Sequence, residues 1–223
     1  MKSSSKRIVI AIDGPAGSGK STVSKLIAKR LGLLYIDTGA MYRALTLKAM
    51  RKGIDLHDEK SLVELAKTTK IELEEKSKLH VFLDGEDVSI PIRTPEVTAE
   101  VKYIARVPGV RHEMVALQRS IGSKQGAVLE GRDIGTVVFP NADYKFYLDA
   151  SPEERAKRRL EDLVELGQKA NVEEVKKDIT ARDESDMKRS VGALKKAKDA
   201  ITIDTTVLSI DEVVDKLLAR ICR

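Results

Sequence analysis

Short apolar runs, separated by longer amphipathic stretches, follow one another along most of the chain. Each run has the length of a buried strand, and the stretches between them repeat their apolar positions with the period of a helix. Strands that are buried on both faces and alternate with helices form parallel sheets with a helical layer on each side. The sequence therefore predicts a three-layer α/β/α fold with about five parallel core strands, at residues 8–12, 33–36, 127–130, 145–148 and 201–204.

The pattern changes between Lys70 and Pro91. Apolar and polar residues alternate there at residues 71–74, 79–83 and 88–90, which is the period of strands with one buried face. The pair at residues 84–85, Asp-Gly, is typical of the tight turn of a hairpin. We therefore expect a small antiparallel sheet inserted into the parallel fold.

Capping residues and glycines mark the ends of several helices. Asp, Asn, Ser and Thr side chains cap helix N-termini, and glycine ends helices because it adopts left-handed backbone angles without strain. These signals predict one helix that ends at Gly32, one from Asp37 or Thr38 to about Lys52, helical segments within residues 95–120 that are broken near Pro108, and helices that begin at Ser151 and Asn171.

The composition narrows the classes of partner. The chain has 40 Lys and Arg against 35 Asp and Glu, and the resulting charge of +5 suits anionic ligands, but the two signs are interleaved. Aromatic residues make up 4% and include no Trp, so we expect no nucleic-acid-binding surface. The single cysteine, Cys222, excludes an internal disulfide and a zinc cluster. No apolar run approaches the roughly 20 residues that span a bilayer, and we expect a cytoplasmic protein without membrane contact.

Residues 14–21, GPAGSGKS, match the phosphate-binding pattern GxxxxGK[ST] at every fixed position. The match lies between the first predicted strand and the first predicted helix, as a P-loop requires. In that setting the loop N–H groups surround the β-phosphate of a nucleoside triphosphate, Lys20 reaches the β and γ oxygens, and Ser21 can hold Mg²⁺. The alternative, a glycine-rich turn with an incidental lysine, leaves the flanking strand and helix unexplained.

Polar residues also follow three other core strands. Ligands of open parallel sheets bind at the carboxyl ends of the strands. Asp37 and Asp149 stand at two of these ends, but a helix cap or a turn explains each of them equally well. Arg132 and Asp133 follow the third core strand. Because Gly131 and Gly135 flank this charged pair and leave backbone room around it, it is the stronger candidate for a site.

The predicted helix from Ser151 carries Arg155, Arg158 and Arg159 on one face. Without other evidence, such a cationic face would be interpreted as an ordinary solvent-exposed helix surface. Because a P-loop precedes it in the chain, we favour a lid helix whose arginines close over the transferring phosphates. The next helix carries Val175, Ile179, Arg182, Asp186 and Arg189 on one stripe. The first residues of this stripe are apolar and the later ones are charged, which indicates a site at the edge of the hydrophobic core. Ion pairing on the helix surface could also account for Arg182 with Asp186.

With these residues in view, the sequence resembles the bacterial cytidylate kinase family along nearly its whole length. The resemblance implies transfer of the γ-phosphoryl group of ATP to CMP or dCMP, with Mg²⁺ as cofactor. The segments at 130–140 and 182–189 are far more specific to this family than the P-loop is. The matching segments are residues 12–22, 37–43, 85–94, 108–111, 130–140 and 182–189.

The resemblance also implies a role for each site residue. It assigns ATP binding to Gly14, Pro15, Ala16, Gly17, Ser18, Gly19, Lys20, Ser21 and Thr22 and to the mobile lid arginines Arg155, Arg158 and Arg159, with Ser21 at the metal. It assigns CMP binding to Thr38 and Tyr42, to Arg43, Arg132 and Arg189 at the phosphate, to Arg111 and Asp133 at the cytosine, and to Arg182 and Asp186 at the sugar. The catalytic group would be Lys20, Arg132, Arg158 and Arg189. The chain departs from the family at Lys102, where a serine commonly contacts the sugar.

The resemblance further implies one nucleoside monophosphate kinase domain over residues 1–223. Its partners would be ATP and CMP or dCMP, and it would act as a monomer. Within the domain we expect a core of residues 1–37, 121–151 and 190–223, a monophosphate-binding region with the inserted sheet at about 38–120, and a lid with its following helix at about 152–189.

Other readings of the P-loop remain open at this stage. Another small-molecule kinase would act on AMP, UMP, shikimate or a sugar acid, and only the family resemblance argues for cytosine. A GTP-dependent switch protein generally carries an N-K-x-D motif, which this sequence lacks. A nucleic-acid-binding ATPase is favoured by the basic pI of about 9.1 and opposed by the scarcity of aromatic residues.

Overall fold

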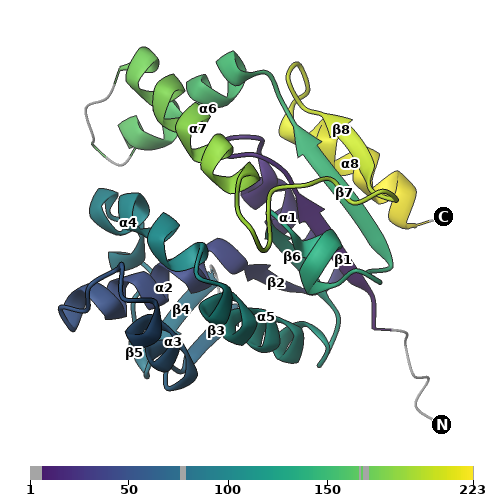
Figure 1. The fold of residues 1–223 in the computed structure, drawn as a ribbon. Helices are drawn as coiled ribbons and strands as arrows, with labels where there is room; N and C mark the ends of the chain where they lie inside the picture. The colour runs from purple at the N-terminus through teal and green to yellow at the C-terminus, as the bar shows by residue number, and fades with distance from the viewer. Residues whose placement is uncertain (1–6, 76–78, 166, 168–170, 223) are drawn as a thin grey trace, which may run out of the picture.

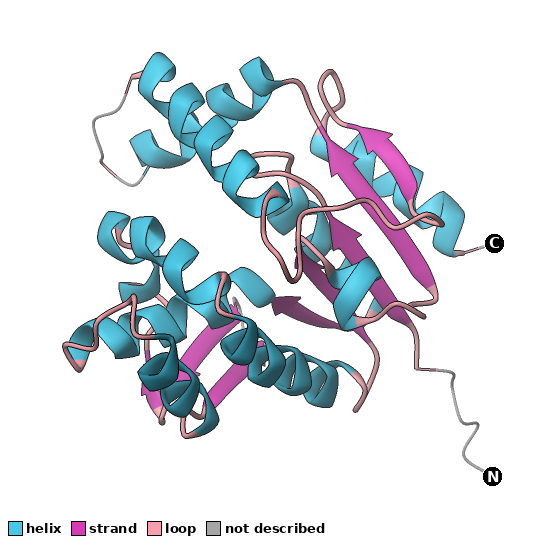
Figure 2. Cartoon of the chain, in the orientation of Figure 1, coloured by secondary structure: helices cyan, strands magenta, loops and turns pink. Residues whose placement is uncertain are grey.

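A computed structural model describes residues 7–75, 79–165, 167 and 171–222 (Figure 1). Helices and strands alternate along the chain, and Figure 2 separates the two kinds of element by colour. The strands are β1 (Val9–Asp13), β2 (Leu34–Asp37), β3 (Ile71–Glu75), β4 (Leu79–Leu83), β5 (Glu86–Asp87), β6 (Ala127–Gly131), β7 (Tyr144–Asp149) and β8 (Ile201–Asp204). The helices are α1 (Lys20–Leu31), α2 (Thr38–Arg51), α3 (Glu59–Lys67), α4 (Pro95–Ala105), α5 (Pro108–Gly122), α6 (Pro152–Glu165), α7 (Val172–Met187) and α8 (Ile210–Ile221), with short helical turns at Pro91–Arg93 and Ile134–Val138.

The main sheet contains five parallel strands in the order β2-β6-β1-β7-β8. The predicted architecture is confirmed, and each of the five predicted strands agrees with the observed one to within a residue or two. The register pairs Asp13 with Gly131 and Asp37 with Glu130. The carboxyl ends of β1, β2 and β6 therefore lie together at one edge of the sheet, where the P-loop and the segment at 130–133 begin.

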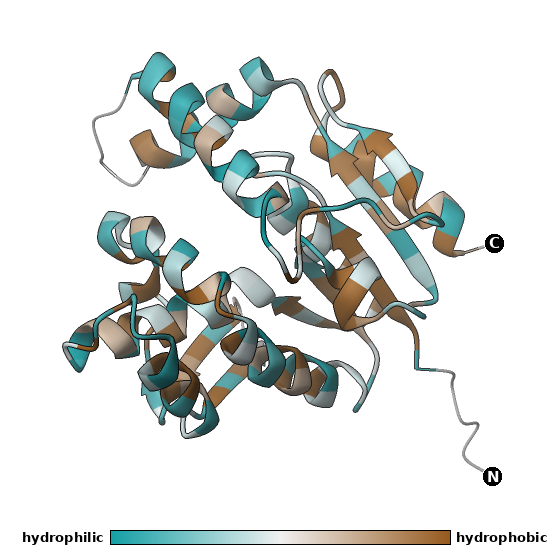
Figure 3. Cartoon of the chain, viewed as in Figure 1, coloured by the Kyte–Doolittle hydropathy of each residue, from teal (hydrophilic) through white to brown (hydrophobic). Residues whose placement is uncertain are grey.

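Helices cover both faces of this sheet because side chains along β1 alternate between them. Ile10 and Ile12 point to the face that α1 and α8 cover, where they pack with Ile27 and Leu217. Ala11 points to the other face, which packs against α2, α5 and the turn at Ile134–Val138. All of these apolar side chains are buried, and Figure 3 shows hydrophobic residues along the strands of the main sheet.

The inserted antiparallel sheet is present in the order β3-β4-β5, and the Asp-Gly pair at 84–85 turns the chain between β4 and β5. The prediction of a strand at 88–90 was wrong, since β5, the third strand of this small sheet, ends at Asp87. The N–H of Val81 donates to the hydroxyl of Ser89 (2.9 Å), and the N–H of Ser89 donates to the Asp87 carboxylate (2.9 Å). The carbonyl oxygen of Val81 still accepts the N–H of Val88 (2.9 Å), but the Ser89 side chain takes the other backbone bond of Val81, and the chain turns toward the helical turn at Pro91–Arg93.

Helix α3 lies in a stretch where the sequence pattern indicated no element. Asp58 caps it by accepting the N–H of Ser61 (3.1 Å), and Leu62 and Leu65 bury its apolar side against the core shared with α5. Four other helix boundaries agree with prediction: Gly32 ends α1, Asp37 caps α2, the break near Pro108 separates α4 from α5, and Asn171 caps α7.

Helices α6 and α7 pack on each other beyond the carboxyl end of β7, while α2 to α5 and the small sheet form a second group at the lower left of Figure 1. In the part of the chain that the structure describes, no helix is both long and apolar enough to cross a membrane.

Candidate active site

The loop after β1 has the backbone of an anion cradle. Gly14, Gly17 and Gly19 have φ of 148°, 77° and 84°, angles that favour glycine. A Cβ on Gly14 would lie 2.0 Å from the carbonyl oxygen of Leu148, so no other residue fits there. Gly19 precedes α1 without a side-chain cap, which leaves the N–H groups at the start of α1 available to a phosphate.

Lys20, the first residue of α1, is buried and turned onto its own loop. Its ammonium group donates to the carbonyl oxygen of Pro15 and to the hydroxyl of Ser18 (3.2 Å). Burial, assisted by the positive charge of Arg132, lowers the pKa of Lys20 to about 7. The oxygens that the ammonium group contacts are neutral, one carbonyl and one hydroxyl. A bound polyphosphate would place anionic oxygens against it and raise the pKa of Lys20 again, so that the side chain is charged.

Glu130, to which the sequence pattern gave no role, lies beside the P-loop at the end of β6. Its two carboxylate oxygens accept the hydroxyl of Ser21 (2.9 Å) and the hydroxyl of Tyr35. Burial and the neighbouring charge of Asp37 raise the pKa of Glu130. Its position one strand away from the P-loop was the signal that could have identified it.

The oxygens of Ser21 and Glu130 fit a hard cation. Mg²⁺ prefers oxygen ligands and is usually held by one or two protein groups together with the phosphates of its nucleotide. Among the residues described, no group of three or more His, Cys, Asp or Glu could hold a metal by itself. Two protein oxygens, those of Ser21 and Glu130, suit a cation that completes its coordination with a bound nucleotide.

The start of α2 contributes a second set of polar groups. Asp37 accepts the N–H of Ala40 (2.8 Å) as a helix cap and also pairs with Arg43 (3.2 Å) and, more loosely, with Arg93 (3.8 Å). Thr38 donates its hydroxyl to the carbonyl oxygen of Glu130 (2.6 Å). The Nε of Arg43 is buried and has no partner in the described chain, so this guanidinium can accept a further anionic ligand.

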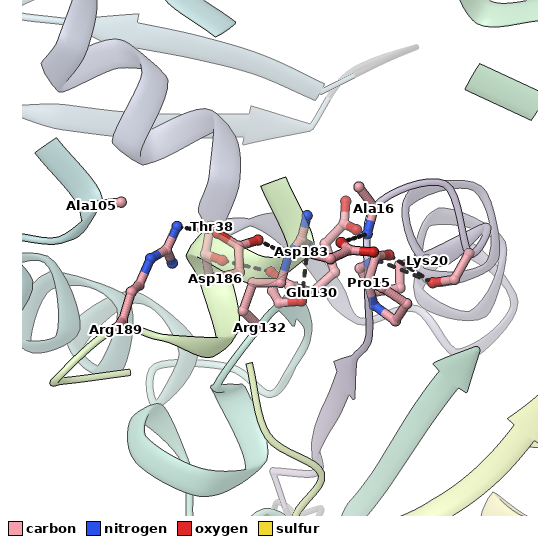
Figure 4. A network of polar contacts seen from close by, with 12 residues as sticks. Pro15, Ala16, Lys20, Thr38, Ala105, Glu130, Arg132, Asp183, Asp186 and Arg189 are labelled. Atoms are coloured by element: carbon pink, nitrogen blue, oxygen red, sulfur yellow. Dashed lines mark hydrogen bonds and ion pairs between the residues drawn. The ribbon is translucent and has the colours of Figure 1, made fainter. Parts of the chain in front are cut away.

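Asp186 on α7 binds two arginines directly. Its carboxylate accepts the Nε of Arg132 (2.7 Å) and an N–H of Arg189, and its side chain is only 3% exposed (Figure 4). Burial alone would raise the pKa of Asp186, but the charges of Arg132, Arg189 and Arg182 outweigh it and hold the pKa below its ordinary value. Each arginine keeps further N–H groups that Asp186 does not use.

Arg182 carries positive charge without a direct partner. No hydrogen bond or ion pair joins it to another residue in the described part of the chain, while burial and the charge of Arg132 lower its pKa to about 10. Arg43 and Arg159 add to that repulsion, and Arg182 in turn lowers the pKa of Lys20. Such an excess of buried positive charge at one point indicates a site for a polyanion.

Arg111 on α5 and Asp133 after β6, the two residues that the family resemblance assigns to the cytosine, form an ion pair. The two side chains are 2% and 8% exposed. The Arg111 guanidinium also lies 5.5 Å from the ring centroid of Tyr42. Arg111 Nε and the Tyr42 hydroxyl are buried without a partner among the described residues, so polar capacity remains for a ligand.

Asp13 at the end of β1 holds the segment that follows Asp133. Its two carboxylate oxygens accept the N–H groups of Ile134 (2.8 Å) and Gly135 (2.7 Å). Burial raises the pKa of Asp13 to about 6, although these two bonds oppose the shift. The sequence pattern did not single out Asp13. Its hydrogen bonds to the segment after β6 can be recognised only once the sheet places β6 next to β1.

Two of the three arginines of α6, Arg155 and Arg158, bind protein groups in this structure. Arg158 donates to Glu154 (3.0 Å) and to the hydroxyl and carbonyl oxygens of Thr205 (3.0 and 2.6 Å). Arg155 pairs with Asp183. Arg159 is partly buried and lies close enough to Arg182 to lower its pKa. The predicted lid face therefore does lie near the P-loop and the arginines of α7.

Lys102, where the family commonly has a serine, is exposed on α4, and its ammonium group lies 5.0 Å from the centroid of the Tyr103 ring. We predict that both CMP and dCMP are accepted and that Lys102→Ser changes the ratio of their kcat/KM values roughly two- to tenfold, the worth of one neutral hydrogen bond. Steady-state kinetics with both acceptors measures this. Unchanged kcat/KM for both would place Lys102 outside the sugar site.

A P-loop on β1 of a five-stranded parallel sheet, facing a cluster of arginines, defines a P-loop kinase. The family model described as cytidylate kinase matches residues 10–223, and the chain belongs to this family. The proposed rivals, a GTP-dependent switch and a nucleic-acid-binding ATPase, are thereby set aside.

Similar proteins support the same family. A cytidylate kinase of Geobacillus sp. (strain WCH70) is 55% identical over 213 residues, 95% of each chain. One of Clostridioides difficile (strain 630) is 48% identical over 214 residues, 96% of this chain and 98% of the relative. Among solved structures, a gluconokinase from Sinorhizobium meliloti 1021 superposes with a TM-score of 0.51 at 17% identity, covering 97% of this chain and 93% of that one, which shows the fold alone.

Proposed function

We infer that this enzyme transfers the γ-phosphoryl group of ATP to CMP or dCMP and releases ADP with CDP or dCDP. The observation that carries this inference is the arginine cluster around Asp186, which faces the buried Lys20 of the P-loop across the carboxyl edge of the sheet (Figure 4). Within a cytidylate kinase, these two cationic groups suit the two substrates, one triphosphate and one monophosphate.

The acceptor oxygen of a nucleoside monophosphate is already anionic at neutral pH. The reaction therefore needs no base to take a proton, and its difficulty is to bring two polyanions together in line. We propose that Lys20, Arg132, Arg158 and Arg189 act on the transferring phosphoryl group, with Arg182 as a neighbouring positive charge. Mg²⁺, when bound, would neutralise charge on the β- and γ-phosphates, and Ser21 with Glu130 would hold it.

We assign the donor site to the P-loop backbone from Gly14 to Thr22, with Arg158 and Arg159 of α6 reaching the phosphates when the lid closes. In this arrangement Arg158 must exchange its bonds to Thr205 for phosphate oxygens. Exclusion of water from the closed site would keep the phosphoryl group from hydrolysis.

We assign the acceptor site to residues from four elements. Arg43, Arg132 and Arg189 hold the phosphate, Arg111 and Asp133 contact the base, and Thr38 and Tyr42 complete the wall that α2 supplies. Arg182 and Asp186 contact the sugar. The buried orphan N–H groups of Arg43 and Arg189 support the phosphate assignment, since each needs an acceptor that the described protein groups do not provide.

The organisation of the domain follows from these assignments. We propose that residues 38–120 bind the monophosphate, that 152–189 form the lid, and that 1–37, 121–151 and 190–223 form the core. A monomeric, cytoplasmic enzyme remains our expectation.

An acceptor panel tests the function. Cytosine offers an amino donor at N4 beside acceptors at N3 and O2, whereas uracil presents an acceptor at O4 and a donor at N3. Asp133 complements the first pattern and would face a like dipole in the second. We therefore expect kcat/KM for CMP to exceed that for UMP by at least roughly tenfold, and Asp133→Ala to lose most of that discrimination.

The assay measures ADP release with CMP, dCMP, UMP, AMP and shikimate. Glu59→Ala, which removes an exposed carboxylate on α3, serves as the matched control. Equal use of CMP and UMP by the unaltered enzyme would contradict the cytosine assignment. Discrimination that persists in Asp133→Ala would move the base contact to another residue.

A further inference from the structure

Two residues of the α6–α7 unit hold the two peptide groups on either side of the Ala16 Cα in the P-loop. The N–H of Ala16 donates to the Asp183 carboxylate (3.2 Å), and the carbonyl oxygen of Ala16 accepts an N–H of Arg155 (3.0 Å). Figure 4 marks the contact between the Asp183 carboxylate and the N–H of Ala16 with a dashed line. The orientation of both peptide groups is therefore fixed from outside the loop.

Arg155 and Asp183 also bind each other. They form an ion pair between side chains that are 9% and 7% exposed, and Arg155 Nε donates to the carbonyl oxygen of Ala150 (3.1 Å). With acceptors at Ala16, Ala150 and Asp183, the guanidinium is surrounded by protein groups. A buried ion pair in which the hydrogen-bonding capacity of both partners is used holds a single geometry.

The backbone of α6 lies equally close to the loop. A Cβ on Gly17 would stand 2.7 Å from the carbonyl oxygen of Arg155, so Gly17 leaves the space that this contact needs. On the next turn of α6, Arg158 donates to the hydroxyl of Thr205. The single proton of this hydroxyl is within reach of two carbonyl oxygens, that of Asp149 (3.0 Å) and that of Ser18 in the loop (3.3 Å). The outer side of the loop is thus held at Ala16 and lies within reach of the Thr205 hydroxyl at Ser18.

We propose that Asp183 and Arg155 are positioning residues that fix the P-loop in its phosphate-binding shape and tie it to the lid helices. This rests on the proposed function, since it concerns how the donor nucleotide is bound. The N–H groups of the cradle must point at the phosphates before the nucleotide arrives, and a loop that had to reorient would lose affinity to the cost of ordering. Arg155 acts here through Ala16 and Asp183, whereas Arg158 and Arg159 remain for the phosphates.

The test measures binding of ADP with Mg²⁺ by calorimetry, together with KM for ATP and for CMP. Asp183→Asn keeps an acceptor for the Ala16 N–H but removes the charge that holds Arg155. We expect the Kd for ADP and the KM for ATP to rise about tenfold, the worth of one charge-assisted hydrogen bond, while KM for CMP stays within about twofold.

The matched control is Glu153→Gln. Glu153 also joins α6 to α7, through an ion pair with Lys176 (2.7 Å), but both side chains are exposed and neither contacts the P-loop. If the α6–α7 contact mattered only for folding, both variants would change the melting temperature and neither would change the Kd for ADP. That result would overturn the proposal.

A double-mutant cycle separates positioning from direct phosphate contact. Arg155→Lys keeps the charge but loses the planar fork that reaches Ala16 and Asp183 together. If the two residues act as one unit, Arg155→Lys combined with Asp183→Asn weakens ADP binding no more than the stronger single change. If Arg155 contacts the nucleotide directly, the two effects multiply, or Asp183→Asn alone leaves the Kd unchanged, and either outcome contradicts the proposal.

Two further outcomes are distinguishable from these. An unaltered enzyme that binds no ADP would overturn the proposed function rather than the positioning role alone. If Asp183→Asn does not fold, Arg155→Lys still decides, because a Kd equal to that of the unaltered enzyme would then show that the Arg155 fork does not shape the donor site.

Discussion

Replacing Lys20 by alanine is expected to lower kcat by roughly a thousandfold or more, because the variant loses a preorganised positive charge at the transferring phosphoryl group. The fold should survive. Burial, assisted by the charge of Arg132, lowers the pKa of Lys20 to about 7, so the folded protein disfavours its charge. Removing the ammonium group therefore removes a buried charge and breaks no ion pair with a described residue. Steady-state ADP release with saturating ATP and CMP measures the effect.

A control lysine separates charge in general from charge at this point. Lys29 lies on the same helix, in its last turn, and is exposed. Lys29→Ala should leave kcat within about twofold, as surface substitutions generally do. Near-normal phosphoryl transfer by a folded Lys20→Ala protein would sink the assignment of this loop to the donor phosphates.

Replacing Asp186 by asparagine is expected to lower kcat/KM for CMP by about a hundredfold or more, the kinetic counterpart of breaking a buried charge pair. Asp186 holds Arg132 and Arg189 in one geometry, and the amide would hold them only weakly. The two guanidinium groups would then lose the carboxylate that binds them directly and would be free to turn from the acceptor phosphate. Alanine would remove the contact altogether but would cost about 3–5 kcal/mol of stability, so asparagine is the better probe.

Binding of ADP with Mg²⁺ should change little in Asp186→Asn, because the P-loop does not contact this carboxylate. The matched control is Glu184→Gln on the same helix, whose ion pair with Lys188 (3.0 Å) is exposed on both sides. A kcat/KM for CMP that stays within threefold in Asp186→Asn, on the scale of an exposed ion pair, would show that the arginines keep their places without Asp186.

The main fold could be predicted because its signals are local. A run such as residues 8–12 is too apolar and too short for anything but a buried strand, and the glycines of the loop after it have few other uses at that spacing. The helices capped by Asp37 and Asn171 were predictable for the same reason, since a capping oxygen acts within three residues of itself.

The sequence pattern failed to predict the secondary structure of segments whose conformation depends on residues far away in the chain. Residues 88–90 alternate like a strand, but the hydroxyl of Ser89, and not a backbone carbonyl, accepts the N–H of Val81, and that bond exists only after β4 has folded beside it. Helix α3 has only nine residues and depends on burial of Leu62 and Leu65 against α5. A short helix of this kind has little stability of its own, so its own sequence predicts it weakly.

The sequence by itself determined the succession of strands and helices along the chain, the phosphate-binding loop and the set of arginines, because these depend on residue type and spacing within short segments. Only the tertiary structure decided what those groups face. Asp13, Glu130 and Asp183 are ordinary acidic residues in the sequence, and they become a clamp on Ile134, a partner of Ser21 and a clamp on Ala16. The physical reason is that a carboxylate forms hydrogen bonds only over about 3 Å. The partners of these carboxylates are therefore decided by the sheet register and helix packing, which bring together residues far apart in the chain.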